Sequence, residues 1–240
     1  MYMLSYDEGK TWSDPKPADE RDGAARSFGN GSAIQLSDGS VIWMISGINE
    51  QSIGNNMSTT VYRSADQAKS FELLATISAD HHLDEPTVAE LPSGRLVNLN
   101  RREGDISWSD DAGCTWSAPV STGVEMADPH LLMMPNGVLA CFHYSYQGRG
   151  VRVILSPDEG KTWHGPEERY GYAVDTSVYG YSHPMLLEDG TVYITYLHTG
   201  GHYPADARSE ALWGLRVQVK DTADGVEILP APGSPATEVR

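Results

Sequence analysis

The stretch Ser5-Tyr6-Asp7-Glu8-Gly9-Lys10-Thr11-Trp12 indicates the fold of the whole chain, because close copies of it recur downstream. The shared pattern is Ser-x-Asp-x-Gly-x-Thr-Trp. It is kept in residues 109–116 and 156–163 and is decayed in residues 64–71, where Ala68 replaces the glycine. The copies start at residues 5, 64, 109 and 156, so they lie 59, 45 and 47 residues apart. Periods of this size are typical of propeller blades or of another repeat array.

The octapeptide, called the Asp box below, has the chemistry of a tight turn. Its aspartate can accept hydrogen bonds from nearby backbone amides, and its glycine can adopt a positive φ. Its tryptophan can cover the apolar side of the hairpin. We therefore predict a structural role for all four copies, although repeated polar residues are easily mistaken for an active site.

A second repeat alternates with the Asp boxes and predicts β-hairpins. Each copy has a turn glycine between two short apolar stretches, and the four turn glycines are Gly39, Gly94, Gly137 and Gly190. A strand, a tight glycine turn and a second strand form a hairpin signature. The Asp box then joins the third and fourth strands of the same unit. Four short strands per repeat match one propeller blade.

These repeats predict one all-β domain over residues 1–240, with four full blades, part of another and no helix of any length. The expected blades span residues 28–80, 81–124, 125–177 and 178–230, after a partial blade at 1–27 and before a tail at 231–240. In the last blade, Leu212 to Val219 is expected to form a strand. We expect Tyr2 to Ser5 either to pair with the last blade or to leave an open edge that invites self-association.

Composition narrows the range of partners. The chain has 17 Lys and Arg against 33 Asp and Glu, a net charge of −16, which argues against binding nucleic acid or anionic membranes. An acidic small ligand would need a local arginine pocket. The two cysteines, Cys114 and Cys141, do not make a disulfide framework. We see neither a signal peptide nor an apolar run of about 20 residues that could span a bilayer, so the location stays open.

Asp boxes on this rhythm resemble those of the sialidase (neuraminidase) superfamily, whose members are six-bladed β-propellers. The resemblance covers essentially the whole chain. It implies that the protein is a glycosidase that acts on carbohydrate without a cofactor, and that it is secreted or periplasmic. Asp boxes alone do not imply catalysis, because non-catalytic propellers also carry them.

Four polar residues occupy equivalent positions, nine residues before the turn glycines: Asn30, Glu85, Asp128 and Tyr181. In a propeller the first strand of each blade lines the central channel, so we expect these side chains to converge at one mouth. His130 and His183 follow two of these positions by two residues and are expected to face the same mouth. No histidine has a metal-ligand spacing, and we predict no metal site.

The resemblance assigns roles to some of these residues. Glu85, followed 16 residues later by Arg101, looks like the sialidase segment with a glutamate and a carboxylate-binding arginine. Gly180-Tyr181-Ser182 looks like the segment with the tyrosine nucleophile, whose proton the glutamate takes. Arg149 is our choice over Arg152 for a second substrate arginine. Asp128 and Asn30 are expected to contact substrate. Residues 144–150 and 199–203 are expected to form loops at the rim of the channel mouth that contact the sugar.

The chain also departs from the family. The family's first arginine, in an Arg-Ile-Pro-like motif, and its acid/base aspartate precede the first Asp box, and the chain begins four residues before that box. We therefore expect either a fragment or a reduced propeller with a different or lost activity. Two functions follow: a retaining, sialidase-like hydrolase of sialic-acid-like or other acidic glycans, or a non-catalytic propeller that binds glycan or protein.

Overall fold

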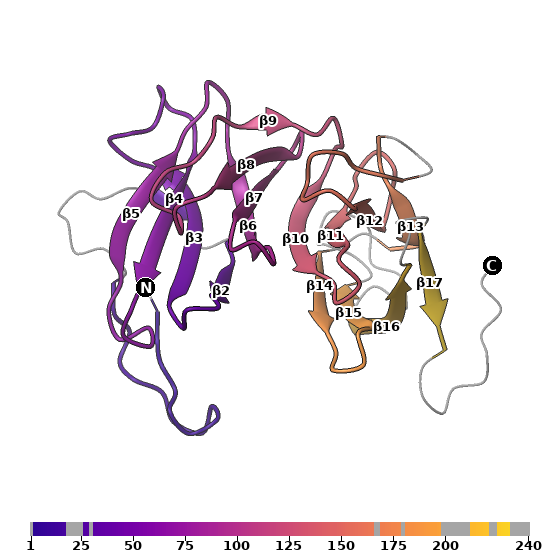
Figure 1. Cartoon of the computed structure of the whole chain (residues 1–240), viewed down its shortest axis with the longest axis horizontal. Coiled ribbons are helices and arrows are strands. Elements are labelled where there is room, and N and C mark those ends of the chain that lie inside the picture. The colour runs from indigo at the N-terminus through magenta and orange to yellow at the C-terminus, as the bar shows by residue number, and fades with distance from the viewer. Residues whose placement is uncertain are drawn as a thin grey trace. The chain divides into compact units, whose positions relative to one another are not determined.

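The computed structural model describes residues 2–17, 26–28, 31–165, 169–178, 181–197, 212–220 and 225–230. Within these ranges the chain forms only β-strands, turns and bridges, and it contains no helix. The strands form four separate antiparallel sheets (Figure 1). Three have the four strands expected of a blade, and the first has a four-stranded path with one further strand beside it. The predicted all-β, bladed fold is thereby confirmed.

Each sheet is built from strands that follow one another in sequence. The first blade contains β1 (Arg26–Phe28), β2 (Ala33–Gln35), β3 (Val41–Ile48), β4 (Ser58–Ser64) and β5 (Glu72–Ile77). The second contains β6 (Asp84–Glu90), β7 (Leu96–Arg101), β8 (Asp105–Ser109) and β9 (Val120–Ser121). The third contains β10 (Ala127–Met133), β11 (Leu139–Tyr144), β12 (Val151–Ser156) and β13 (Tyr172–Asp175). The fourth contains β14 (Ser182–Leu186), β15 (Val192–Leu197), β16 (Leu212–Val219) and β17 (Val226–Leu229).

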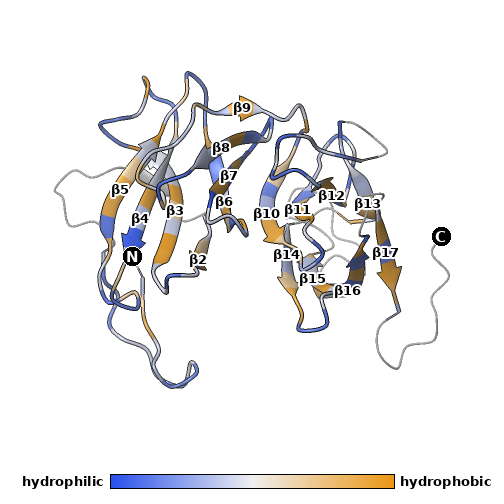
Figure 2. Cartoon of the chain, viewed as in Figure 1, coloured by the Kyte–Doolittle hydropathy of each residue, from blue (hydrophilic) through white to orange (hydrophobic). Residues whose placement is uncertain are grey.

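The chain divides into two compact units, each with its own apolar core. The first unit comprises Met1–Asn98 and Ser107–Val120, and the second comprises Leu99–Ile106 and Ser121–Arg240. In the first unit, Ile42 and Met44 of β3 are fully buried together with Leu83 and Leu96. In the second unit, Phe142 of β11 belongs to a cluster with Val153, Ile194 and Val217. The apolar residues of these strands are visible in Figure 2.

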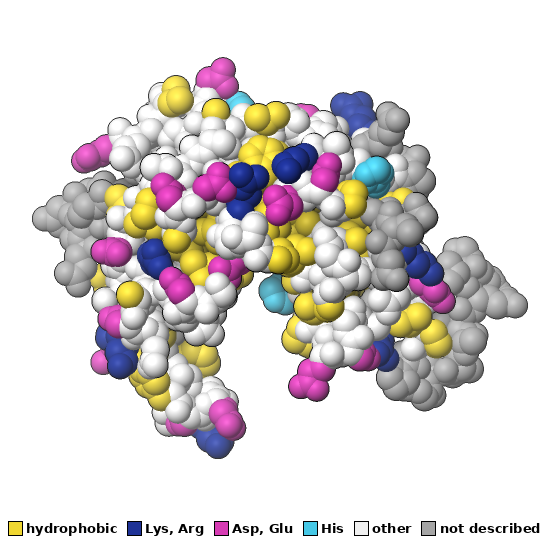
Figure 3. Space-filling view, viewed as in Figure 1, with side chains coloured by type: hydrophobic (Ala, Val, Ile, Leu, Met, Phe, Trp, Pro, Cys, Tyr) yellow, Lys and Arg dark blue, Asp and Glu magenta, His cyan; other side chains and the backbone are white. Residues whose placement is uncertain are grey.

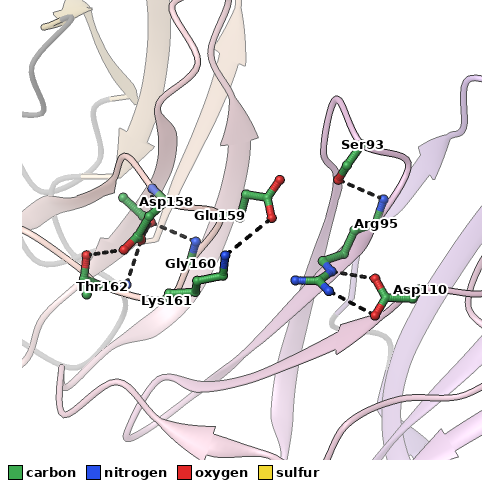
Figure 4. A network of polar contacts seen from close by, with 9 residues as sticks. Ser93, Arg95, Asp110, Asp158, Glu159, Gly160, Lys161 and Thr162 are labelled. Carbon is green, nitrogen blue, oxygen red and sulfur yellow. Dashed lines mark hydrogen bonds and ion pairs between the residues drawn. The ribbon is translucent and has the colours of Figure 1, made fainter.

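The Asp boxes are turns closed by their own hydrogen bonds. In the third blade, Asp158 accepts bonds from the amide and the hydroxyl of Thr162, at 2.8 and 2.7 Å, and Ser156 Oγ accepts one from the amide of Gly160 at 2.8 Å (Figure 4). The other three copies repeat this arrangement. In the second blade, the hydroxyl and then the amide of Thr115 hold the pKa of the Asp111 carboxyl below its usual value. These aspartates are turn acceptors, as predicted.

The Asp boxes also lie where the repeats predicted. Residues 64–71 join β4 to β5, residues 109–116 lead from β8 towards β9, and residues 156–163 lead from β12 towards β13. Each of these three boxes thus connects the third and fourth strands of its blade. The side chains of their Asp and Thr residues form hydrogen bonds with one another within the turn, so the functional side chains are sought elsewhere in the blades.

The N-terminal hairpin corrects one expectation. Tyr2 pairs with Lys16 in an isolated antiparallel bridge, and its hydroxyl donates to the carbonyl of Lys69 at 2.9 Å. Its ring packs edge-on against Trp43 and Phe71, with centroids 6.2 and 5.1 Å away. Tyr2 thus pairs with Lys16 and not with a strand of the last blade, and the other expected alternative, an open edge that invites self-association, stays a prediction. A local backbone partner and an aromatic cluster of the first unit hold Tyr2 instead.

Two further findings bear on the earlier expectations. No helix formed by the described residues is long and apolar enough to cross a membrane. Strand β16 spans Leu212–Val219, as its sequence predicted. The loop at 199–203 and the tail at 231–240 lie outside the described residues, and the blade boundaries proposed from the sequence stay predictions.

Candidate functional site

The first strands of the second and third blades share a positive φ at the positions singled out by the repeat. Glu85 is the second residue of β6 and Asp128 is the second residue of β10. Their φ angles are 44° and 48°, in the left-handed region that side chains other than glycine rarely adopt. In β10 the pairing register also shifts between Ala127 and His130. Backbone strain of this kind tends to occur at functional sites, so it adds weight to both positions.

Tyr181 lies directly before β14, at the equivalent place in the fourth blade, and is 39% exposed. Its hydroxyl lies 3.4 Å from the hydroxyl of Tyr146, which follows β11. The same Tyr146 hydroxyl accepts a hydrogen bond from Nη2 of Arg101, at the end of β7, over 3.3 Å. Arg101, Tyr146 and Tyr181 therefore meet within the second unit, and we call them the Arg-Tyr-Tyr cluster.

The arginine in this cluster is held in a second way. Its guanidinium carbon lies 5.7 Å from the centroid of the Tyr146 ring, within the range of a cation–π contact. Arg101 is half-buried, whereas its sequence neighbour Arg102 is exposed. The choice of Arg101 over Arg102 as the site arginine thus agrees with their surroundings.

A carboxylate fixes the loop that carries Tyr146. The Glu125 carboxylate accepts hydrogen bonds from the hydroxyl of Ser145 at 2.5 Å and from the backbone amide of Tyr146 at 3.3 Å. The Ser145 amide also bonds to the carbonyl of Gly150, at 3.0 Å, which closes the loop on itself. Glu125 therefore positions Tyr146. Neither residue was among the site residues chosen from the sequence, although residues 144–150 were expected to form a rim loop.

The two arginines considered for the second substrate contact differ sharply. Arg152 is 3% exposed, and its guanidinium donates to the carbonyls of Gly148, Arg149 and Gly171. Arg152 thus stabilises the loop at residues 144–150 through backbone hydrogen bonds and serves a structural role. The side chain of Arg149 is exposed on the same loop as Tyr146, and its φ is 58°. Arg149 stays the candidate for substrate contact.

The two histidines that were expected to face the same channel mouth contact one another, although the mouth itself stays a prediction. The rings of His130 and His183 lie edge to face, with centroids 5.0 Å apart. Nε2 of His130 is 3.2 Å from Oδ2 of Asp128, an ion pair when the histidine is protonated. His183 lies two residues beyond Tyr181 in the chain. No group of three or more His, Cys, Asp or Glu residues that could hold a metal ion occurs among the residues the structure describes.

The remaining candidates cannot be joined to the cluster in the same way. Glu85 belongs to the first unit, is 5% exposed, and its backbone amide donates a hydrogen bond to Oδ1 of Asp84 at 2.9 Å. Its approach to Tyr181 stays a prediction. Asn30 lies outside the described residues. The geometry that is established is a cation beside two phenols, which suits an anionic ligand with apolar faces.

The comparisons with known proteins agree with the repeats. The model of the BNR repeat-like domain matches residues 1–145. The chain belongs to the BNR repeat-like domain family. No curated protein sequence matches it. Among solved structures, a protein of unknown function from Dyadobacter fermentans superposes with a TM-score of 0.73 at 18% identity, over 95% of this chain and 63% of that protein.

Two further structures of this BNR-family fold are glycoside hydrolases. The α-L-arabinanase of Penicillium chrysogenum, complexed with arabinobiose, gives a TM-score of 0.59 at 16% identity, over 89% of this chain and 69% of the enzyme. The K499G mutant of the NanB sialidase of Streptococcus pneumoniae gives 0.62 at 17% identity, over 84% of this chain and 32% of the enzyme. The chain has the sialidase-like β-propeller fold, and it spans less than two thirds of the Dyadobacter and NanB chains.

Proposed function

We propose that this BNR-repeat chain provides a sialidase-like glycosidase site centred on the Arg-Tyr-Tyr cluster. The observation that carries the proposal is the Tyr146 hydroxyl, 3.3 Å from Arg101 Nη2 and 3.4 Å from the Tyr181 hydroxyl. The repeat and the family resemblance selected Arg101 and Tyr181 independently of Tyr146. Their meeting through a third side chain supports a common site.

The proposed ligand is a sialic-acid-like or other acidic sugar. A guanidinium presents paired N–H donors that match a carboxylate, and a neutral phenol does not repel it. The chain's net charge of −16 makes a local arginine necessary for an acidic ligand. Arg149, exposed on the Tyr146 loop, is proposed as the second arginine, and Asp128 is proposed to contact the substrate. No cofactor and no nucleic acid are part of this proposal.

In the proposed reaction, the Tyr181 oxygen attacks the anomeric carbon and the bond to the leaving oxygen breaks. The family resemblance assigns the uptake of the phenol proton to Glu85, because an unassisted tyrosine with a pKa near 10 would keep that proton at neutral pH. Water then cleaves the glycosyl-tyrosine, so the anomeric configuration is retained. Protonation of the leaving group is the step for which these residues supply no assigned acid.

The structural relatives support a second candidate. Arabinanase and arabinofuranosidase structures share the fold, and arabinobiose is a neutral sugar. A site for neutral sugars would not need Arg101 for charge. A third candidate is a non-catalytic propeller that binds glycan or protein. We also propose a secreted or periplasmic location, because a glycosidase encounters polymeric glycans there.

A panel of substrates separates these candidates. We expect the protein to cleave a 4-methylumbelliferyl α-sialoside, whose leaving group needs little protonation, and to leave the matching α-L-arabinofuranoside intact. A natural sialyl-lactose should react about 10²- to 10⁴-fold more slowly than the activated sialoside, the usual value of general acid catalysis. Cleavage of the arabinofuranoside alone would favour the neutral-sugar candidate. Sialic acid binding without turnover would favour the binding module.

A further inference from the structure

One face of the fourth blade is exposed where the earlier blades are buried. The third residue after each turn glycine occupies an equivalent place on the second strand: Ile42, Val97, Ala140 and Tyr193. The first three are completely buried, whereas Tyr193 is 38% exposed. The opposite face of β15 is buried, because Val192 and Ile194 belong to the core shared with the third blade. On β15 the exposure is therefore confined to the face turned away from the core shared with the third blade.

The neighbours of Tyr193 on this face are apolar and exposed as well. Met185, its register partner on β14, is 55% exposed, and the paired Leu197 and Leu212 are 47% and 71% exposed. Tyr193 lies over Gly214 of β16, where an added Cβ would come within 2.2 Å of its hydroxyl. Hydrophobic side chains reach the surface over β14 and β15 in Figure 3. We call Met185, Tyr193, Leu197 and Leu212 the apolar face of the fourth blade.

The earlier blades show what covers such a face. In the first unit, Gly113 is the turn glycine of the second blade's Asp box. A Cβ added at this glycine would lie 3.3 Å from Leu74 and 3.4 Å from Ile42 of the first blade. In the second unit, a Cβ added at Gly160 of the third blade's Asp box would lie 2.7 Å from Ile106 of the second blade. An Asp box therefore packs its glycine turn against the preceding blade. Ile42 is the residue of the first blade that corresponds to Tyr193.

One Asp box has no such surface beneath it. Gly113 and Gly160 are buried, whereas Gly9 is exposed, and a Cβ on Gly9 would have only its own Trp12 within 4 Å, at 3.8 Å. Trp12 is 60% exposed and Tyr6 is 70% exposed, whereas Trp116 and Trp163 of the later boxes are half-buried. The first Asp box thus presents an uncovered apolar side, visible as hydrophobic side chains on the N-terminal hairpin in Figure 3.

We propose that these two surfaces are the halves of one interface, and that a second copy of this chain supplies the missing half. The Trp12 side of the first Asp box in one copy docks on the apolar face of the fourth blade in another. The contact reproduces the packing of Gly113 on Ile42 between two molecules. It differs from the pairing of open strand edges, because side chains of a sheet face make the contact. The contact is also heterologous, so each docked pair leaves one half free on each copy.

Charge sets the conditions for the association. Each copy carries a net charge of −16, so two copies repel one another at low ionic strength. The proposed contact is apolar and carries no ion pair. Added salt screens the repulsion and therefore strengthens the association, whereas an interface built on ion pairs would weaken.

Three variants of the full chain test the proposal by analytical ultracentrifugation over a roughly hundredfold concentration range. Trp12→Glu removes one half of the interface, and Met185→Glu removes the other. Val120→Glu is the matched control, because Val120 is 56% exposed on β9, outside both surfaces. We expect the wild type and Val120→Glu to gain mass with concentration and with salt, and Trp12→Glu and Met185→Glu to stay monomeric. Circular dichroism checks that each variant is folded.

A mixture of the two interface variants gives the sharpest outcome. Trp12→Glu keeps its fourth-blade face and Met185→Glu keeps its first Asp box, so an equimolar mixture should form one-to-one dimers and nothing larger. A wild type that stays monomeric at every concentration and salt would overturn the proposal. Undiminished association of either single variant would overturn it as well, and would favour pairing at a strand edge.

Discussion

The hydroxyl of Tyr146 lies 3.4 Å from the hydroxyl of Tyr181, although the two residues come from different blades. Tyr146 also accepts a hydrogen bond from Arg101, so it bridges a cation and the proposed nucleophile. This relationship gives the proposed function a geometry that can be tested one side chain at a time.

Arg101→Ala should weaken the binding of sialic acid by about 10- to 150-fold, because a hydrogen bond to a charged group contributes about 1.5–3 kcal/mol. Arg101→Lys should recover only part of this loss, since an ammonium lacks the paired donors. Isothermal titration calorimetry measures both. Arg95→Ala is the control, because Arg95 pairs with Asp110 at 2.6 Å in the first unit. Equal affinities of Arg101→Ala and Arg95→Ala would exclude Arg101 from the site.

Tyr146→Phe should weaken the same binding by about 2- to 12-fold, the worth of one ordinary hydrogen bond. The ring and its contact with the Arg101 guanidinium remain, so the loss reflects the hydroxyl alone. Tyr170→Phe is the matched control, because the Tyr170 hydroxyl bonds to the Gln147 side chain at 3.5 Å and not to Arg101 or Tyr181. If both variants bind like the wild type, the Tyr146 hydroxyl contributes nothing to the site.

The sequence predicted the features that depend on local bonds or on repetition. Asp158, Ser156 and Thr162 satisfy one another within a single turn, so the octapeptide alone indicated that turn. Glu85 and Asp128 share a left-handed φ, which agrees with their equivalence in the repeat.

Residues placed by distant contacts could not be predicted in this way. Tyr146 is positioned by Glu125, 21 residues earlier in the chain, and no repeat marks that pair. For the same reason the sequence did not reveal the partners of Tyr2, for which pairing with the last blade was one of two expected alternatives. Its ring packs on Trp43 and Phe71, which lie 41 and 69 residues further along the chain.

Ala68→Gly should raise the free energy of unfolding by about 0.5–1 kcal/mol. Ala68 takes the glycine position of the decayed Asp box and has a φ of 61°, where a Cβ is strained. Gly9→Ala makes the reverse change at a φ of 83° and should lower the stability by a similar amount. Urea denaturation measures both free energies. A less stable Ala68→Gly would contradict the assignment of strain to this turn.

Stability should fall as the pH is lowered from 7 to 5. Burial, and then the nearby positive charge of Arg152, lower the pKa of His143 from 6.5 to about 4. The unfolded chain therefore binds the proton more tightly than the folded chain, and acid favours unfolding. The expected loss over this range is about 2 kcal/mol. The Asp-box carboxylates act only below about pH 4, since their pKa values are lowered as well.

Urea midpoints at pH 7, 6 and 5 check this dependence, and the His143 ring should stay neutral at pH 5 by NMR. His164→Gln is the control, because His164 is exposed and its removal should leave the pH dependence unchanged. A His143 ring that titrates near pH 6.5 in the folded protein would contradict the expected burial effect.

The most direct test of the proposed function compares the wild type with Tyr181→Phe on a 4-methylumbelliferyl α-sialoside, with sialic acid binding measured on the same samples. Tyr181→Phe removes the attacking oxygen and leaves the ring and the fold. We predict that the wild type releases the fluorophore, and that Tyr181→Phe loses turnover while its affinity for sialic acid changes less than about tenfold. Turnover by Tyr181→Phe equal to that of the wild type would contradict the role of Tyr181 as the nucleophile.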